Sequence, residues 1–211
     1  MSTEAQTKEK VQMDPKYIIT LTVTLCVTCI IVAGLLGLVN LVTKDPIAAI
    51  NKEKTEAAMR EVVADPDGST FSDALELTDE MTAAASGAGA TLTEAYGVTV
   101  GGEAGGYALK IDTSGSQGTI TMMVGVDADG TVTGVSIVKN SETSGIGSKV
   151  MNNEIVKATG VHVLDQFKGK SAADGTLSVG SNIDAISGAT VSSRGVTTGV
   201  NAALAVAGVL G

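Results

Sequence analysis

The chain has 211 residues, and its 23 Asp and Glu against 14 Lys and Arg give a formal net charge of −9. An acidic surface repels phosphate backbones, and aromatic residues are only 2% of the chain, which disfavours nucleic-acid binding through a basic patch or a stacking platform. Hydrophobic residues make up 44%, enough for a folded core, whereas two Cys and one His are too few for a disulfide scaffold or a multi-histidine metal centre.

Residues 17–43 contain no charged side chain. About 20 helical residues cross a bilayer core of about 30 Å, so this run predicts one transmembrane helix preceded by a short tail, residues 1–16. The alternative is a cleaved signal peptide, which has a shorter apolar core and ends at a small-residue cleavage site that residues 43–46 do not provide. Both flanks are similarly basic, so the charge bias leaves the orientation open.

Cys26 and Cys29 lie on one face of this predicted helix. Their C-x-x-C spacing also occurs in redox and metal sites, but the chain has no further thiolates to complete such a site. Packing of two small, moderately apolar side chains inside the membrane is therefore the favoured interpretation.

Residues 44–90 are interpreted as a helical stalk and linker. Asp45 and Pro46 are typical of a helix start, and residues 47–63 have the apolar spacing of an amphipathic helix leading away from the membrane. The Pro- and Gly-containing residues 65–69 end that helix. Residues 70–90 are rich in Ala, Gly, Ser and acidic side chains and are interpreted as a loop.

From residue 91 onward, short β-branched runs separated by Gly predict an antiparallel sheet, with strands near residues 96–100, 107–111, 119–126 and 131–138. Residues 127–130, Asp-Ala-Asp-Gly, predict a tight hairpin turn. The Gly-rich residues 101–106 lack the Lys-Ser/Thr pair of a phosphate-binding loop and are expected to form a flexible hairpin tip.

Two further helices are predicted in this region. One covers residues 148–159, and the other is the uncharged run 196–211, which favours a buried core helix over a second membrane span. His162 has no second His or Cys nearby and is interpreted as structural. The predicted fold class is therefore α+β, with one N-terminal transmembrane helix followed by an antiparallel-sheet domain, residues 91–211, with flanking helices.

The segment with the clearest chemistry is residues 184–193, Asp-Ala-Ile-Ser-Gly-Ala-Thr-Val-Ser-Ser. Its small-residue turn delivers Thr190 to the start of a helix, where no bulky neighbour shields the hydroxyl. A helix N-terminus favours a bound phosphate, and Ser192 and Ser193 are available as extra donors. On these residues alone, an ordinary capped helix with Thr or Ser at its start is the favoured interpretation.

The pattern D-x-x-S-G-A-T-x-S resembles the modification signature of FMN-binding domains, in which FMN is joined through its phosphate to the Thr hydroxyl. The chain is similar over nearly its whole length to the G subunits of Rnf complexes, the ion-translocating ferredoxin:NAD oxidoreductases. It is also similar to the C subunits of sodium-pumping NADH:quinone reductases. Residues 142–147 resemble the family loop E-T-P-G-L-G, with Ser144 and Ile146 in place of Pro and Leu.

This resemblance implies FMN held covalently by Thr190, with Asp184 recognised by a separate Mg-dependent flavin transferase that takes FMN from FAD and releases AMP. The turn around the attachment site and the ring-contact loop supply the remaining expected cofactor contacts. These contacts are Ser187, Gly188, Ala189 and Val191 at the attachment, and Glu142, Thr143, Gly145, Ile146, Gly147 and Lys149 at the ring.

The resemblance also implies an electron-transfer subunit whose partners are other membrane and peripheral subunits, the transferase and membrane lipid. It implies a cytoplasmic tail and a flavin domain on the extracytoplasmic side of the cell membrane. We expect neither catalytic residues of its own nor a bound metal in this chain. Two alternatives stay open: the corresponding quinone-reductase subunit, and a membrane-anchored binding or structural domain without flavin.

Overall fold

The structure, a computed structural model, describes residues 15–210. Most of the predicted cytoplasmic tail, residues 1–14, and the C-terminal Gly211 lie outside the described residues. The chain divides into two compact units, residues 1–50 and residues 51–211. The first unit contains the apolar segment and the second contains a five-stranded sheet with its helices.

Helix α1 begins at Pro15 and ends at Val62, so it forms the described part of the first unit and continues into the second. Within the described residues it is the one helix long and apolar enough to cross a membrane. Several of its Thr hydroxyls donate to backbone carbonyls of the preceding turn, as for Thr22 and Thr28 at 2.9 and 3.0 Å. These hydroxyls are satisfied without water, which suits a Thr-rich helix to lipid.

The prediction that a new helix starts at Asp45 and Pro46 is wrong, because α1 passes through Pro46. Proline has no N–H and removes one hydrogen bond from a helix interior, but the helix-forming segments on both sides outweigh that loss. The last turns of α1 belong to the second unit and are buried at Thr55, Ala58, Met59 and Val62. This end of the predicted stalk is therefore part of the domain.

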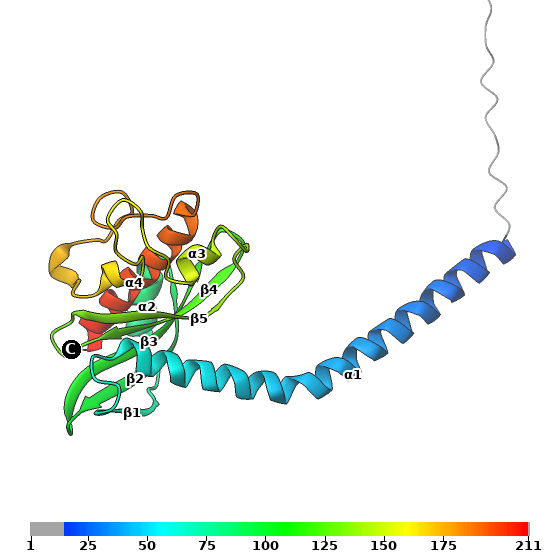
Figure 1. Cartoon of the computed structure of the whole chain (residues 1–211). Helices are drawn as coiled ribbons and strands as arrows, with labels where there is room; N and C mark the ends of the chain where they lie inside the picture. The colour runs from blue at the N-terminus through cyan, green and yellow to red at the C-terminus, as the bar shows by residue number, and fades with distance from the viewer. Residues whose placement is uncertain (1–14, 211) are drawn as a thin grey trace, which may run out of the picture. The chain divides into compact units, whose positions relative to one another are not determined.

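The second unit is built on an antiparallel meander, as the sequence predicts (Figure 1). Hairpin connections join the last four strands in succession, whereas residues 75–90 join the first two. Asp127 closes the predicted turn between the last two strands by accepting from the Thr131 amide at 2.8 Å. The strands, in their order across the sheet, are β1 (Ser69–Ala74), β2 (Thr91–Val100), β3 (Glu103–Ser114), β4 (Thr119–Val126) and β5 (Val132–Asn140).

Residues 70–90 are not a loop, contrary to the sequence-based interpretation. They contain most of the edge strand β1, which pairs with β2, and helix α2 (Asp79–Gly87). The hydroxyl of Thr78 caps α2 by accepting from the Met81 amide at 3.3 Å. Because Met81 and Ala85 are buried in the main core, this segment is an integral layer of the domain.

Helices cover both faces of the sheet, and successive strand residues alternate between them. Met122 lies in the core formed with α2 and α4 (Thr190–Leu210), whereas Met123 lies in a smaller core formed with the last turns of α1. Gly125 and Gly134 allow α1 to lie close to the sheet, because a Cβ at either would lie within 3.0 Å of backbone atoms of Val62. Each face of the sheet therefore supports one of the two cores.

Helix α3 (Ser148–Met151) is much shorter than the helix predicted over residues 148–159. Asn153 ends it in a left-handed conformation, with φ of 52°, and its side-chain oxygen accepts from the Leu164 amide at 2.7 Å. His162 hydrogen-bonds through Nδ1 to the Asn153 carbonyl, a contact that fits its structural interpretation. After residue 154, backbone bonds to residues 161–163 take the place of helical ones, as from the Val156 amide to the Val161 carbonyl at 2.8 Å.

The C-terminal run forms a buried core helix, as predicted. Helix α4 begins at Thr190, and residues along most of its length are buried. Gly195 and Gly199, one turn apart, bring its backbone against the sheet, where Cβ atoms would lie 2.5 Å from the Ser114 carbonyl oxygen and 2.7 Å from the Met122 sulfur. The sheet therefore sets the position of the N-terminal half of α4.

Tyr96 supplies a prediction about alkaline stability. Its hydroxyl donates to Glu94 at 2.6 Å, and Lys110 pairs with the same carboxylate at 3.0 Å. Burial, followed by the hydrogen bond and charge of Glu94, raises the pKa of Tyr96 from 10.0 to about 12. We expect stability from this phenol to be complete below pH 10 and lost between pH 10 and about 12.

The measurement is the unfolding temperature from pH 9 to 12 (from about one unit below to about two units above the ordinary Tyr pKa), compared with Tyr96→Phe. The Phe variant should show a shallower alkaline decline, because it has no phenol to ionise. Tyr107→Phe is the matched control. Equal declines in the wild-type and Tyr96→Phe chains would contradict the prediction.

Candidate functional site

The small-residue turn predicted from the sequence leads directly into α4. Gly188 adopts φ of +82°, a conformation that favours glycine, and the Ala189 amide donates to the Ile186 carbonyl at 2.9 Å. Ala189 is buried and anchors the turn, whereas Ser187 and Gly188 are exposed. Thr190 follows as the exposed first residue of the helix, so its hydroxyl is accessible to a second molecule.

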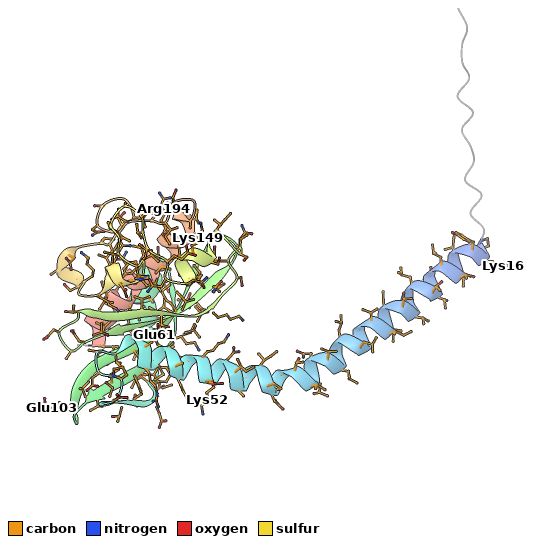
Figure 2. The ribbon with its side chains drawn as sticks, viewed as in Figure 1. Lys16, Lys52, Glu61, Glu103, Lys149 and Arg194 are labelled. Carbon is orange, nitrogen blue, oxygen red and sulfur yellow. The ribbon has the colours of Figure 1, made fainter. Side chains whose placement is uncertain are left out.

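Positive charge gathers at this end of α4. Ser193 is the first helix residue whose amide donates to a backbone carbonyl, so the amides of residues 190–192 remain available at the positive end of the helix dipole. Arg194 lies four residues after Thr190, hence on the same side of the helix, and is exposed. Figure 2 shows Arg194 and Lys149 at the same end of the domain.

The two sequence motifs meet through one carboxylate. Glu142, at the start of the ring-contact loop (residues 142–147), accepts from the Ser192 hydroxyl on α4 at 2.6 Å. Its other oxygen accepts from the amides of Ser116 and Gln117, in the turn between β3 and β4, at 2.6 and 3.3 Å. The structure thus brings together segments that are 50 residues apart in the chain.

The ring-contact loop presents a mixed surface beside the attachment turn. The Gly145 amide donates to the Ser148 hydroxyl at 2.8 Å, and Gly145 has φ of +83° with open space where a side chain would stand. Thr143 is exposed, and Ile146 and Val191 are each 54% exposed. Two apolar side chains, one from each motif, therefore face solvent.

Gly147 has a local explanation that the sequence did not indicate. A Cβ at this buried position would lie 2.9 Å from the Glu142 Cβ and closer still to its carboxylate. Room for Glu142, rather than close approach of another molecule to the backbone, thus accounts for this glycine.

Asp184 lies just before the attachment turn and is exposed. The Gln166 side chain binds its backbone twice, accepting from the Asp184 amide at 2.9 Å and donating to its carbonyl at 3.1 Å. Sequence reasoning missed Gln166, Ser116 and Gln117, since each acts on a segment distant in the chain. The spacing of Arg194 from Thr190 was a local signal that could have been noticed.

Comparison with known proteins adds the family. The family described as FMN-binding domain matches residues 115–205, a range that holds the Glu142 contacts and the start of α4. The G subunit of the Na(+)-translocating ferredoxin:NAD(+) oxidoreductase complex of Acetobacterium woodii is 37% identical, over 95% of this chain and 97% of that protein. The chain belongs to the family of G subunits of ion-translocating oxidoreductase (Rnf) complexes.

Two further G subunits are similar to this chain. The G subunit of the ion-translocating oxidoreductase complex of Methanosarcina acetivorans is 30% identical, over 90% of this chain and 95% of that protein. The G subunit of the proton-translocating ferredoxin:NAD(+) oxidoreductase complex of Clostridium ljungdahlii is 33% identical, over 52% of this chain and 57% of that protein. The matches to the Acetobacterium woodii and Methanosarcina acetivorans subunits cover most of this chain, including its sheet domain.

Proposed function

We propose that this chain is the electron-transfer subunit of a membrane-bound, ion-translocating ferredoxin:NAD oxidoreductase complex, and that it carries FMN joined by a phosphodiester to Thr190. Family membership and the FMN-binding match support the redox role. The single observation that carries the attachment is the exposed Thr190 hydroxyl at the N-terminus of α4, directly after the Ser-Gly-Ala turn.

The residues present suit a phosphate ester. One negative charge remains on a phosphodiester, and the amides of residues 190–192, the helix dipole and Arg194 all stabilise such a charge. Ile146 and Val191 offer apolar surface of the kind an aromatic ring covers. FMN, when bound, supplies the electron-transfer chemistry, while the chain sets its position and surroundings.

Attachment has a simple physical benefit for an electron carrier. A tethered cofactor cannot diffuse away, so its local concentration at the ring-contact loop stays high even where the noncovalent contacts are weak. The long apolar helix α1 anchors the domain at a bilayer and offers Gly34 and Gly37 for close packing against membrane helices of other subunits. Partners of this chain are therefore such subunits, membrane lipid and a flavin transferase.

The transferase reaction requires an accessible nucleophile. The Thr190 oxygen attacks the FMN phosphorus of FAD, the bond to AMP breaks, and the hydroxyl proton is released to the transferase. Exposure of Thr190, and the backbone of Asp184 held by Gln166, present the modification segment on the surface. We assign the exposed Asp184 carboxylate to recognition by the transferase.

The direct test is the covalent state of the full chain purified from membranes that contain the transferase. Flavin fluorescence should survive in a denaturing gel band. The intact mass should exceed the polypeptide mass by the amount added when one FMN is joined through its phosphate. Protein made without the transferase is the control and should be dark. A dark band and an unmodified mass from transferase-containing cells would reject the flavin function in favour of a plain membrane-anchored domain.

Orientation gives a second prediction. We propose that residues 1–16 are cytoplasmic, residues 17–43 span the membrane, and residues 44–211 lie outside the cytoplasm. A reporter enzyme active only outside the cytoplasm should be active when fused after residue 211 and silent when fused before residue 1. A stable C-terminal fusion that stays silent, with an active N-terminal one, would reverse the orientation.

A further inference from the structure

Glu142 joins three segments that are distant in the sequence. Its Oε2 accepts from the Ser192 hydroxyl at 2.6 Å, and its Oε1 accepts from the Ser116 and Gln117 amides at 2.6 and 3.3 Å. Hydrogen bonds to an ionised carboxylate are stronger than those between neutral groups. One side chain therefore links the first turn of α4, the β3–β4 turn and the ring-contact loop.

Two glycines create the space that this side chain occupies. A Cβ at Gly115 would overlap Oε1 of Glu142, and a Cβ at Gly147 would overlap Oε2. Gly147 has φ of −63°, which any residue adopts, so backbone conformation does not require glycine there. Gly145, in the same loop, has open space at its Cβ position. The Glu142 side chain therefore needs glycine at positions 115 and 147, but not at position 145.

The link to α4 depends on this carboxylate. Among the hydrogen bonds of the described residues, the Ser192–Glu142 bond is the one that joins residues 141–147 to α4. Ser192 is 1% exposed, so the bond is shielded from water and its loss leaves a buried hydroxyl without this acceptor. Without Glu142, no hydrogen bond among the described residues would join the loop to α4.

We propose that Glu142 is a positioning residue, which holds the ring-contact loop against the start of α4 so that the flavin attached to Thr190 meets a preformed surface. The proposal rests on the proposed function and revises the expected role of Glu142. Its carboxylate is occupied by the protein and acts on the flavin through the loop, and the direct contacts fall to exposed neighbours such as Ile146. Preorganisation of this kind avoids ordering the loop when the ring binds.

The test uses the full chain, loaded by the transferase, and measures the fluorescence anisotropy of the tethered flavin together with intact mass and unfolding temperature. Glu142→Ala should stay covalently loaded but lose anisotropy, because the ring is no longer held. Gly147→Ala should show the same loss, since the added methyl displaces the Glu142 side chain. Glu142→Gln should retain most of the anisotropy, because an amide can accept from Ser116 and donate to Ser192.

Gly208→Ala is the matched control, because its Cβ would meet nothing within 4 Å, and it should behave as wild type. Should Glu142→Ala fail to fold, Gly147→Ala and Ser192→Ala decide the question. Wild-type anisotropy in loaded, folded Glu142→Ala or in both of these substitutes would overturn the positioning role, as would a lower unfolding temperature without loss of anisotropy. A wild-type chain without the FMN mass would instead reject the proposed function.

Discussion

Replacing Thr190 with Val is expected to abolish covalent flavin and electron transfer through this subunit while leaving the fold intact. Valine keeps the size and shape of threonine but has no oxygen, and phosphoryl transfer depends on a correctly placed nucleophile. Thr190 is exposed, so loss of its hydroxyl should change stability little. In-gel flavin fluorescence and peptide mass measure the modification, and insertion into the membrane fraction shows that the variant is made.

The neighbouring hydroxyls cannot replace that of Thr190. Ser192 is buried and donates to Glu142, and Ser193 is buried and donates to the Ala189 carbonyl at 3.1 Å. Both are therefore committed to the protein and hidden from a transferase. Thr190→Ser is the control, because it keeps an exposed hydroxyl and should retain part of the modification. An FMN mass on Thr190→Val would move the attachment to another residue.

Local sequence was sufficient where short-range chemistry decides the structure. Strand β4 has the bounds predicted from its β-branched residues. Asp127 closes the turn at residues 127–130 by accepting from the Thr131 amide, only four residues further along the chain. Thr190 likewise begins a helix, because a small-residue turn and the helix-forming run after it are contiguous. These features require no knowledge of the rest of the fold.

Features that depend on distant partners were missed or wrong. Strand β1 exists because Ser69 pairs with Val100 at the edge of the sheet, and its own sequence is too polar to predict a strand. The helix predicted over residues 148–159 stops early because Asn153 is bound by the Leu164 amide. The pattern within either segment contains no sign of these partners.

The site divides in the same way. The sequence predicts residues of both motifs as cofactor contacts, but it contains no sign that the two segments touch each other. The Ser192–Glu142 bond spans 50 residues and couples them. Substitutions in the ring-contact loop are therefore expected to alter the position of Thr190 as well as the surroundings of the flavin ring.

The position of α4 depends on Gly195, so replacement of this residue is the second change from which we expect a large effect. A Cβ there would lie 2.5 Å from the Ser114 carbonyl oxygen, a backbone atom of β3, and 3.3 Å from Ile120. Gly195→Val must push α4 away from the sheet, and overpacking of this kind costs about 3 kcal/mol at the upper end of its usual range. Calorimetry of the full chain in detergent should report the lower stability.

The same displacement should reach the flavin site, because Ser114 immediately precedes the turn that binds Glu142. We therefore expect Gly195→Val to reduce both the unfolding temperature and the anisotropy of whatever flavin is attached. Gly208→Val controls for the change of residue type, since that position is on the same helix, has open space and should stay within about 0.5 kcal/mol of wild type. Equal stability of the two variants would mean that α4 does not depend on its glycine contact with β3 to hold Thr190 in place.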